Sequence, residues 1–356
     1  MSSILSGSIV PERHGFPLSA TLGGVDASLK CSALRYPVSP GGMTLIFIHG
    51  VSGHKEQYHT TITRLLSLRD VATYDIREIW SIDFPNHGEA ATLNRRLLDE
   101  YKAHSGKDEG TCTTMDIAAY LHAFLSLSRF RGHNIVGMGH SGGCTVWVRA
   151  LTMFTSVYPN ALILLEPTLM FPFMSPTDPR SIHGAANVRG ARAKRDTWSS
   201  RAEFRHWLAT GGKSIWSRWD PRVLDLYVEH ALEEVVSSEG HGSYITPKLR
   251  KDEEAAIYTC QAHTIEPSQF ASVCTALNEA GRHGVHIIWA ELEEFVSKTA
   301  KAEILDAAGH RVKTQRTVAG SGHLVGRVVF VVWAFDDLWC EIGSAIATGR
   351  AWRCDA

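Results

Sequence analysis

The 356-residue sequence lacks several features that mark particular classes of protein. Its formal net charge is only −1, so no excess of positive charge indicates binding to nucleic acid or to an anionic membrane surface. Cysteine is scarce, and none of the seven cysteines lies at Cys-x-x-Cys spacing from another. We therefore expect reduced thiols in an intracellular compartment, with neither a disulfide framework nor a zinc site.

Long hydrophobic runs are also missing. The longest, residues 328–335, is far shorter than the roughly 20 residues that cross a bilayer, so no membrane span is expected. Residues 1–7 carry no basic segment followed by an apolar core, which argues against a signal peptide. The composition, 44% hydrophobic and 21% charged, is typical of a soluble globular protein, and the length suits one large α/β domain or two small ones.

One glycine-rich stretch, residues 137–143, organises the chain. It follows an apolar run and precedes a predicted helix, and within it Gly139-x-Ser141-x-Gly143 fits a nucleophile elbow. Glycines two residues either side of the serine leave room for the tight turn and for the helix to pack on neighbouring strands. The helix N-terminus then places the N–H of Gly142 beside Ser141, where an oxyanion would form. The sequence therefore predicts a serine nucleophile.

A second glycine turn follows the first buried strand, predicted over residues 43–48. His-Gly at this position usually precedes the second oxyanion donor of such folds, so we expect the N–H of Val51 to be the partner of that of Gly142. His87, in the loop after the strand predicted over 76–82, is expected to support that loop. The other residues expected to shape the substrate site are His49, Gly50 and His140.

The rest of the pattern indicates an α/β fold with a mostly parallel central sheet flanked by helices. Edge strands are expected before residue 40; further strands are predicted over 161–165, 285–289 and 312–318, and helices over 56–68, 115–130 and 144–151. Residues 168–283 differ, with mostly helical segments that include 204–208 and 223–236. We interpret them as a helical lid inserted into a hydrolase core formed by residues 1–167 and 284–356. Within it, Trp198 is expected to line an apolar substrate pocket, with packing inside the lid as the alternative.

A serine nucleophile needs a base, because its hydroxyl barely ionises at neutral pH. His323 lies in a glycine-rich loop after the last predicted strand and follows the serine in chain order, as this arrangement requires. The acid has two candidates. Glu166 ends a buried strand, where an unpaired carboxylate would be costly, so a partner such as His323 is expected. Glu293 stands at the other usual place, among acidic neighbours typical of a solvated loop; we favour Glu166 and keep Glu293 as the alternative.

Several stretches combine into a more specific pattern. They are His49-Gly50-Val51 with Lys55-Glu56-x-Tyr58, Ile76-Arg77-x-Ile79-Trp80, Gly139-His140-Ser141-x-Gly143, Leu165-Glu166-Pro167, Arg195-Asp196-x-Trp198-x-Ser200-Arg201 and Asp220-Pro221-Arg222-x-Leu224-Asp225. With them, over residues 43–167 and 285–324, the chain resembles α/β-hydrolases. More narrowly, it resembles fungal secondary-metabolism hydrolases, a group that includes the peroxisomal acyl-CoA hydrolase of mycophenolic acid synthesis and the host-selective-toxin biosynthesis hydrolases. That group is similar in placing its acid after the strand that follows the elbow helix, which supports Glu166.

The resemblance implies a serine hydrolase without metal or cofactor that cleaves an acyl ester or thioester of a lipophilic small molecule, such as an acyl-CoA in secondary-metabolite or toxin biosynthesis. A carboxylesterase or lactonase is the alternative, and a non-catalytic small-molecule binder is a second one. The resemblance also implies a peroxisomal location. However, residues 354–356 are not a Ser-Lys-Leu type of address, and residues 326–356 depart from the group's pattern, so a cytoplasmic location stays open. A homodimer and a monomer are both left open.

Overall fold

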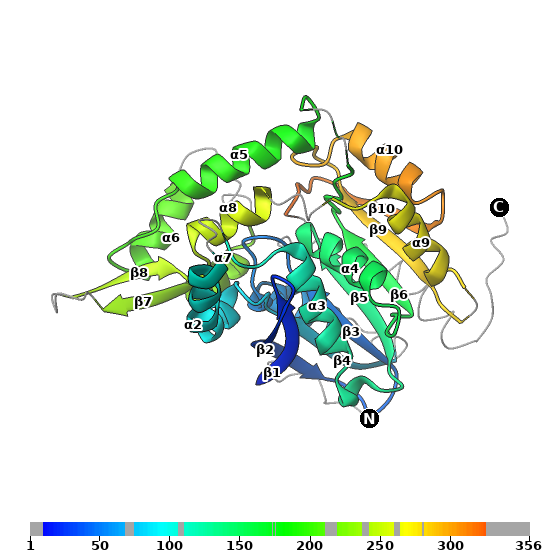
Figure 1. The fold of residues 1–356 in the computed structure, drawn as a ribbon, viewed down its shortest axis with the longest axis horizontal. Helices are drawn as coiled ribbons and strands as arrows, with labels where there is room; N and C mark the ends of the chain where they lie inside the picture. Colours follow the sequence, from blue (N-terminus) through cyan, green and yellow to red (C-terminus); the bar gives the residue numbers. More distant parts are fainter. Residues whose placement is uncertain are drawn as a thin grey trace.

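An eight-stranded sheet forms the centre of the computed structural model (Figure 1). The structure describes residues 10–67, 75–105, 110–172, 174, 176–210, 219–236, 242–259, 264–279 and 281–324. The strand order is β1-β2-β4-β3-β5-β6-β9-β10. The strands are β1 (Glu12–Leu22), β2 (Val25–Pro37), β3 (Met43–Ile48), β4 (Ile76–Ile82), β5 (Asn134–His140), β6 (Ala161–Leu165), β9 (Gly284–Ala290) and β10 (Val312–Val318).

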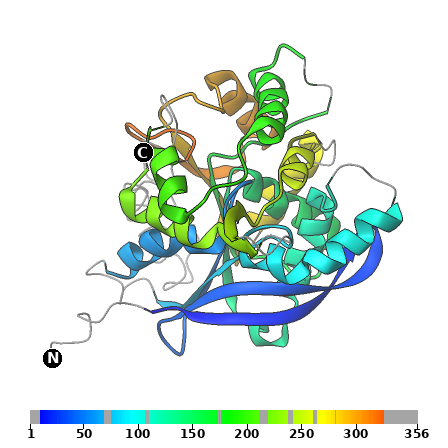
Figure 2. The ribbon, with the colours of Figure 1, turned by 90° about the vertical axis from the view of Figure 1, so that its left-hand side faces the viewer.

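Strand direction divides the sheet into two parts. β1 and β2 form a long antiparallel hairpin along one edge, blue in Figure 2, and β2 pairs antiparallel with β4. All other pairs, from β4 to β10, are parallel. The carboxyl ends of the parallel strands therefore meet at one edge, where the loops that bear the candidate site residues also lie.

Helices cover both faces of this sheet, which is why the inner strands are continuous apolar runs. On one face α3, α4, α9 and α10 enclose the larger core, which contains Trp80 and Trp147. On the other face α1 packs against the sheet through residues such as Ile62, beside Phe47. The helices outside the predicted lid are α1 (His59–Leu66), α2 (Gly88–Ser105), α3 (Thr114–Leu125), α4 (Gly142–Met153) and α10 (Lys298–Ala307).

The strand predictions agree with the structure, most directly for β3 and β6, which are buried along their whole length. The helix predictions need corrections at their ends. The helix expected over 56–68 begins as the short 3-10 helix η1 (Lys55–Tyr58) before α1, and the one expected over 115–130 ends at Leu125. The long helix α2 was not predicted, because much of its surface is polar and exposed and its apolar spacing is weak.

The segment expected to be a helical lid also contains a hairpin. Its elements are α5 (Pro179–Ala193), α6 (Arg201–Thr210), α7 (Pro221–His230), β7 (Leu232–Val236), β8 (Ser243–Pro247) and α8 (Lys251–Thr259). α7 begins at Pro221, with the Asp220 carboxylate accepting the N–H of Arg222 as its N-cap. The prediction of helix over 223–236 is wrong in its second half. Residues 232–236 alternate in burial and pair antiparallel with 243–247, so they form a strand instead.

One further helix of that segment belongs to the core. α9 (Pro267–Leu277) lies between residues 168 and 283 but packs against α4 and β9, and its residues Phe270 and Val273 are buried in the larger core. The elements that lie over the carboxyl edge of the sheet therefore end with α8 (Figure 1). We restrict the term "lid" to the elements α5 to α8.

A buried histidine on β9, His286, predicts acid sensitivity. Burial lowers the pKa of His286 from its usual 6.5 to about 4, while its ring nitrogens contact Thr314 Oγ1 at 2.9 Å and the carbonyl oxygen of His283 at 3.0 Å. As the pH falls, this histidine takes up a proton near pH 6.5 in the unfolded chain but only near pH 4 in the folded chain. The free energy of unfolding is therefore unaffected above pH 6.5 and falls between pH 6.5 and 4, by up to about 3 kcal/mol from this residue. Urea unfolding at pH 7 and pH 4.5 measures the loss, which should be smaller in His286→Gln; an equal loss in both proteins would contradict the assignment.

Candidate active site

Ser141 stands at the turn between β5 and α4, with a backbone φ of +51°. This left-handed conformation is strained for a non-glycine residue, and it places the side chain at the carboxyl edge of the sheet. The neighbouring glycines permit the tight packing: a Cβ on Gly139 would lie 2.8 Å from the backbone of Gly143, and a Cβ on Gly143 would lie 2.6 Å from the carbonyl oxygens of Ile48 and His49. This is the geometry that a nucleophile elbow requires.

Ser141, His323 and Glu166 are joined by hydrogen bonds. His323 Nε2 lies 2.8 Å from Ser141 Oγ, and His323 Nδ1 lies 3.2 Å from Glu166 Oε2. Glu166 is fully buried, and its other carboxylate oxygen accepts the N–H of Ala290 at 2.7 Å. A carboxylate beside Nδ1 keeps the proton on that nitrogen, so Nε2 is left to accept the serine proton. The arrangement can therefore activate Ser141 as a nucleophile.

The alternative acid, Glu293, lies elsewhere. Its exposed carboxylate accepts the N–H of Lys298 at 2.9 Å, at the start of α10. It therefore supports the first turn of α10, whose N-cap is Ser297. The structure brings Glu166, rather than Glu293, to His323.

The two acidic neighbours of Glu293 hold the histidine loop. Glu294 accepts the N–H of His323 at 2.8 Å, and Glu291 accepts the N–H of Gly320 at 2.7 Å. The sequence pattern of three acids suggests only a solvated loop, because each partner is 29 residues away along the chain. The structure shows that two of them position the loop that carries the imidazole.

Val51 and Gly142 lie side by side next to the serine. A Cβ added to Gly142 would be 3.0 Å from Val51 Cγ2 and 3.7 Å from Val51 N. As the first residue of α4, Gly142 has no acceptor for its N–H within the helix, and the helix dipole adds partial positive charge there. The absence of a side chain at Gly50 lets the loop after β3 pack closely against the serine, since a Cβ on Gly50 would lie 3.0 Å from Ser141 Cβ. The N–H groups of Val51 and Gly142 are therefore the expected donors of an oxyanion hole.

The histidines expected near the substrate occupy different positions. His140 lines the cavity, and its Nε2 lies 2.9 Å from the carbonyl oxygen of His323. His49 is fully buried under the loop after β3, where its Nε2 accepts the N–H of Phe84 at 3.1 Å and its Nδ1 contacts the carbonyl oxygen of Gly50 at 2.8 Å. His49 and Gly50 therefore support the loop that carries Val51, and they do not line the cavity.

Trp198 does not have the position expected of a substrate-binding residue. It is 3% exposed and lies in the apolar core of the lid, with its ring centroid 4.6 Å from that of Phe204 and 5.5 Å from that of Trp207. Its backbone N–H and C=O both bond to Ile245. The expected pocket role is corrected accordingly: Trp198 packs the lid, because its indole is large enough to fill the space between α6 and the β7–β8 hairpin.

A buried lysine holds the loop after β3 from below. Lys55 Nζ lies 2.9 Å from both Asp83 Oδ2 and Glu56 Oε1. Burial opposes its charge, but these two carboxylates raise the pKa of Lys55 above its usual value, so it stays protonated. The Asp83 carboxylate also accepts the backbone N–H of Lys55 at 2.8 Å. The lysine and the aspartate thus fix the chain a few residues after Val51.

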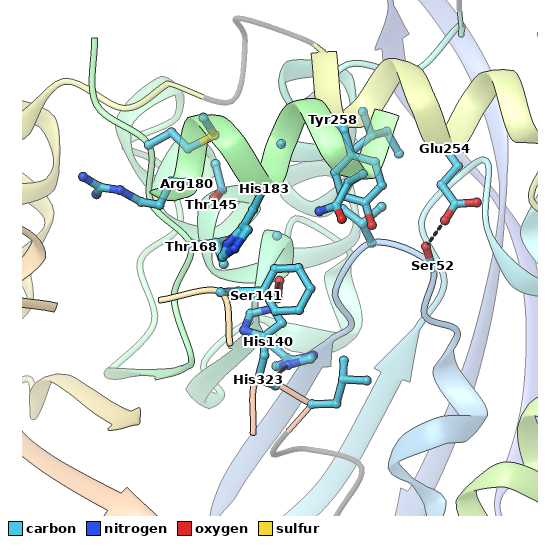
Figure 3. Close-up of a pocket in the computed structure, with 18 of the residues that line it drawn as sticks. Ser52, His140, Ser141, Thr145, Thr168, Arg180, His183, Glu254, Tyr258 and His323 are labelled. Carbon is cyan, nitrogen blue, oxygen red and sulfur yellow. Dashed lines mark hydrogen bonds between the residues drawn. The ribbon is translucent and has the colours of Figure 1, made fainter. Parts of the chain in front are cut away.

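A cavity of about 260 Å³ lies over Ser141 (Figure 3). Its lid side was not predicted in detail: His183 of α5 and Tyr258 of α8 point into the space above the serine. Phe295, which lies 4.6 Å from the His323 ring, forms part of the wall. No sequence signal marks these residues beyond their membership of the lid segment. A cavity of this size suits a small acyl or alcohol group.

Within the residues that the structure describes, no group of three or more histidine, cysteine, aspartate or glutamate side chains is arranged to hold a metal ion. Among the described helices, none combines the length and the apolar composition needed to cross a membrane.

The sheet order, the β5–α4 turn with its serine, and the histidine on the loop after β10 define a protein of the α/β-hydrolase fold. The model of the alpha/beta hydrolase family matches residues 45–329, and the chain belongs to this family. Comparison of the sequence with curated proteins finds no significant match.

Solved structures with the same fold include enzymes of several kinds. The peroxisomal alpha-beta-hydrolase Lpx1 from Saccharomyces cerevisiae is similar with a TM-score of 0.68 at 16% identity, over 97% of this chain and 93% of Lpx1. An esterase from Thermogutta terrifontis and the thioesterase domain from the curacin biosynthetic pathway each give a TM-score of 0.55 at 12% identity, over 95% of this chain and all of theirs. At such identities the similarity shows the fold, which esterases and thioesterases share.

Proposed function

We propose that the protein is a serine hydrolase that cleaves an acyl ester or thioester of a small lipophilic molecule. The observation that carries the proposal is the hydrogen-bonded line from Ser141 through His323 to the buried Glu166. A fully buried carboxylate is costly unless it is paired, and here its partners are an imidazole, a backbone N–H and the Lys301 ammonium 3.9 Å from Oε1. Membership of the alpha/beta hydrolase family supports the same chemistry.

In the proposed reaction, Ser141 Oγ attacks the carbonyl carbon while His323 Nε2 takes the serine proton. The N–H groups of Val51 and Gly142 hold the oxyanion of the tetrahedral intermediate, and Glu166 stabilises the imidazolium. The intermediate collapses as His323 gives the proton to the leaving alcohol or thiol. Water then attacks the acyl-enzyme with His323 again as base, which releases the acid and restores Ser141.

The cavity limits the substrate. Much of its wall is apolar, as at Val51, Met170 and Leu324, while His183 and Tyr258 supply polar groups from the lid. A volume of about 260 Å³ is too small for a whole acyl-CoA, so only the acyl part of such a substrate would lie inside. We therefore propose that the lid closes over the acyl group. Acyl-CoA thioesters follow from the resemblance to fungal secondary-metabolism hydrolases; a carboxylic ester or lactone is the alternative.

An intracellular location is part of the proposal, with the peroxisome implied by the resemblance to that group. Lpx1, which shares the fold, is itself described as peroxisomal. Residues 326–356, which depart from the group's pattern, lie outside the described residues.

A paired substrate series tests the proposed class. Wild-type protein is assayed with p-nitrophenyl esters and with CoA thioesters that carry the same acyl chains. We expect turnover of both, a higher kcat/KM for the thioester of each pair, and a decline for long acyl chains, because the cavity over Ser141 is small. Higher kcat/KM for the esters would favour the carboxylesterase alternative. Folded protein that is stabilised by ligands but turns nothing over would favour the binder.

A further inference from the structure

The residue after the proposed oxyanion donor is bonded to the lid. Ser52 has a left-handed backbone, with φ of +63°, and its Oγ donates to Glu254 Oε1 of α8 at 2.6 Å (Figure 3). Glu254 is 7% exposed, and its other oxygen pairs with Lys194 at the end of α5. A buried carboxylate on the lid thus supports a strained residue that adjoins Val51.

The other side of Ser52 is held by a second chain of hydrogen bonds. The N–H of Ser52 donates to His87 Nε2 at 3.3 Å, His87 Nδ1 lies 2.7 Å from Asn86 Oδ1, and Asn86 Nδ2 donates to Glu253 Oε2 at 3.0 Å. In this chain of hydrogen bonds His87 Nε2 accepts and His87 Nδ1 donates, which requires a neutral imidazole with its proton on Nδ1. Burial lowers the pKa of His87 well below its usual value, which keeps it in that neutral form.

Glu253 and Glu254 are neighbours on α8, so the two chains close into a ring of five residues: Ser52, His87, Asn86, Glu253 and Glu254. Glu253 also accepts the N–H of Thr111 at 2.9 Å and its hydroxyl at 2.8 Å. This anchors α8 on the hydrolase core. The helix that carries the Glu254 carboxylate is therefore held in place.

An oxyanion hole works because its donors are held in place before the charge develops, within about 2.7–3.1 Å of the oxyanion. Val51 lies in a loop whose next residue, Ser52, is in a conformation that costs free energy. Without outside support such a residue relaxes, the Val51–Ser52 peptide rotates, and the backbone of Val51 on its other side shifts with it. The ring supplies that support from the lid and from the loop of His87.

We propose that Glu254 is a positioning residue: through Ser52 it orients the backbone N–H of Val51, so that the oxyanion hole is complete only when α8 is docked. The inference rests on the proposed function and adds a role for the lid beyond covering the substrate. A lid that assembles the transition-state site affects kcat, because the N–H of Val51 bonds the oxyanion more strongly than it bonds the ground-state carbonyl.

The test uses Ser52→Ala and Glu254→Gln in the full-length protein with a p-nitrophenyl ester. We expect kcat to fall about 10- to 100-fold with KM within about threefold, since complete loss of one oxyanion donor costs roughly 10²- to 10³-fold. The inhibition constant of a trifluoromethyl ketone, which forms a tetrahedral adduct on the serine, should rise in proportion to the loss of kcat/KM. The double variant should be no worse than the poorer single variant, because the two residues act as one unit.

Glu233→Gln is the matched control. Glu233 of β7 joins the lid to α2 through Arg95 and Thr92 and has no bond to Ser52, so its variant removes a lid contact at β7 but leaves intact the bonds that dock α8 and hold Ser52. The control should keep the wild-type kcat. The role of Glu254 would be overturned by an equal loss of kcat in the control, by a rise in KM alone, or by unchanged kinetics in Ser52→Ala. Because Ser52→Ala removes only a hydroxyl, it tests the role even if Glu254→Gln folds poorly. Absence of turnover by wild type would instead refute the proposed function, and this role with it.

Discussion

Ser141→Ala is expected to lose ester hydrolysis almost completely, with kcat lower by on the order of 10⁴- to 10⁶-fold. Alanine keeps the elbow and the packing of α4, but no hydroxyl remains 2.8 Å from His323 Nε2 to attack the carbonyl. The measurement is steady-state hydrolysis of a p-nitrophenyl ester, with circular dichroism to confirm that the variant is folded.

Ser126→Ala is a suitable control for this variant. Ser126 is exposed at the end of α3, where its Oγ bonds to the carbonyl oxygen of His122 at 2.8 Å, far from the cavity. It should keep the wild-type kcat. Activity within tenfold of wild type in Ser141→Ala would mean that another group is the nucleophile.

Glu166→Gln is expected to lower kcat by about 10³- to 10⁴-fold with little change in KM. The amide nitrogen of glutamine can donate to His323 Nδ1, which then has to accept and so carries no proton. The proton moves to Nε2, the nitrogen that must accept from Ser141, and the imidazolium loses its stabilising charge. The volume of the side chain is unchanged, so the variant isolates the charge and the tautomer.

Glu293→Gln is the comparison that decides between the two acids. Its exposed carboxylate accepts the N–H of Lys298, but Ser297 remains as the N-cap of α10, so the substitution should cost little stability and does not touch His323. We expect kcat within about threefold of wild type. A large loss of kcat in Glu293→Gln, with activity retained in Glu166→Gln, would show that the acid assignment is wrong. The narrower family resemblance would then lose support.

The sheet could be predicted from the sequence because burial on two faces leaves a continuous apolar run. The residues that end such runs could be predicted for the same reason. Glu166 is the clearest case: an acid at the end of a buried strand needs a partner, and the structure places His323 beside it.

Contacts between distant segments could not be predicted where neither segment carries a recognisable motif. Ser52 and Glu254 are 202 residues apart, and nothing near either one indicates the other. Trp198 shows the same limit, since an indole in an apolar segment suits a substrate pocket and a lid core equally well. The strand β7 was missed because residues 232–236 continue the charged and apolar pattern of α7, and only their pairing with β8 decides their conformation.

Every step of the proposed reaction depends on Ser141 being an activated nucleophile. Incubation with a fluorophosphonate, followed by intact mass measurement and peptide mapping, tests this without knowledge of the natural substrate. We expect one adduct per chain, on Ser141, which forms on wild type and is absent from Ser141→Ala. Folded wild-type protein that takes up no adduct, or an adduct on a different serine, would contradict the proposed mechanism.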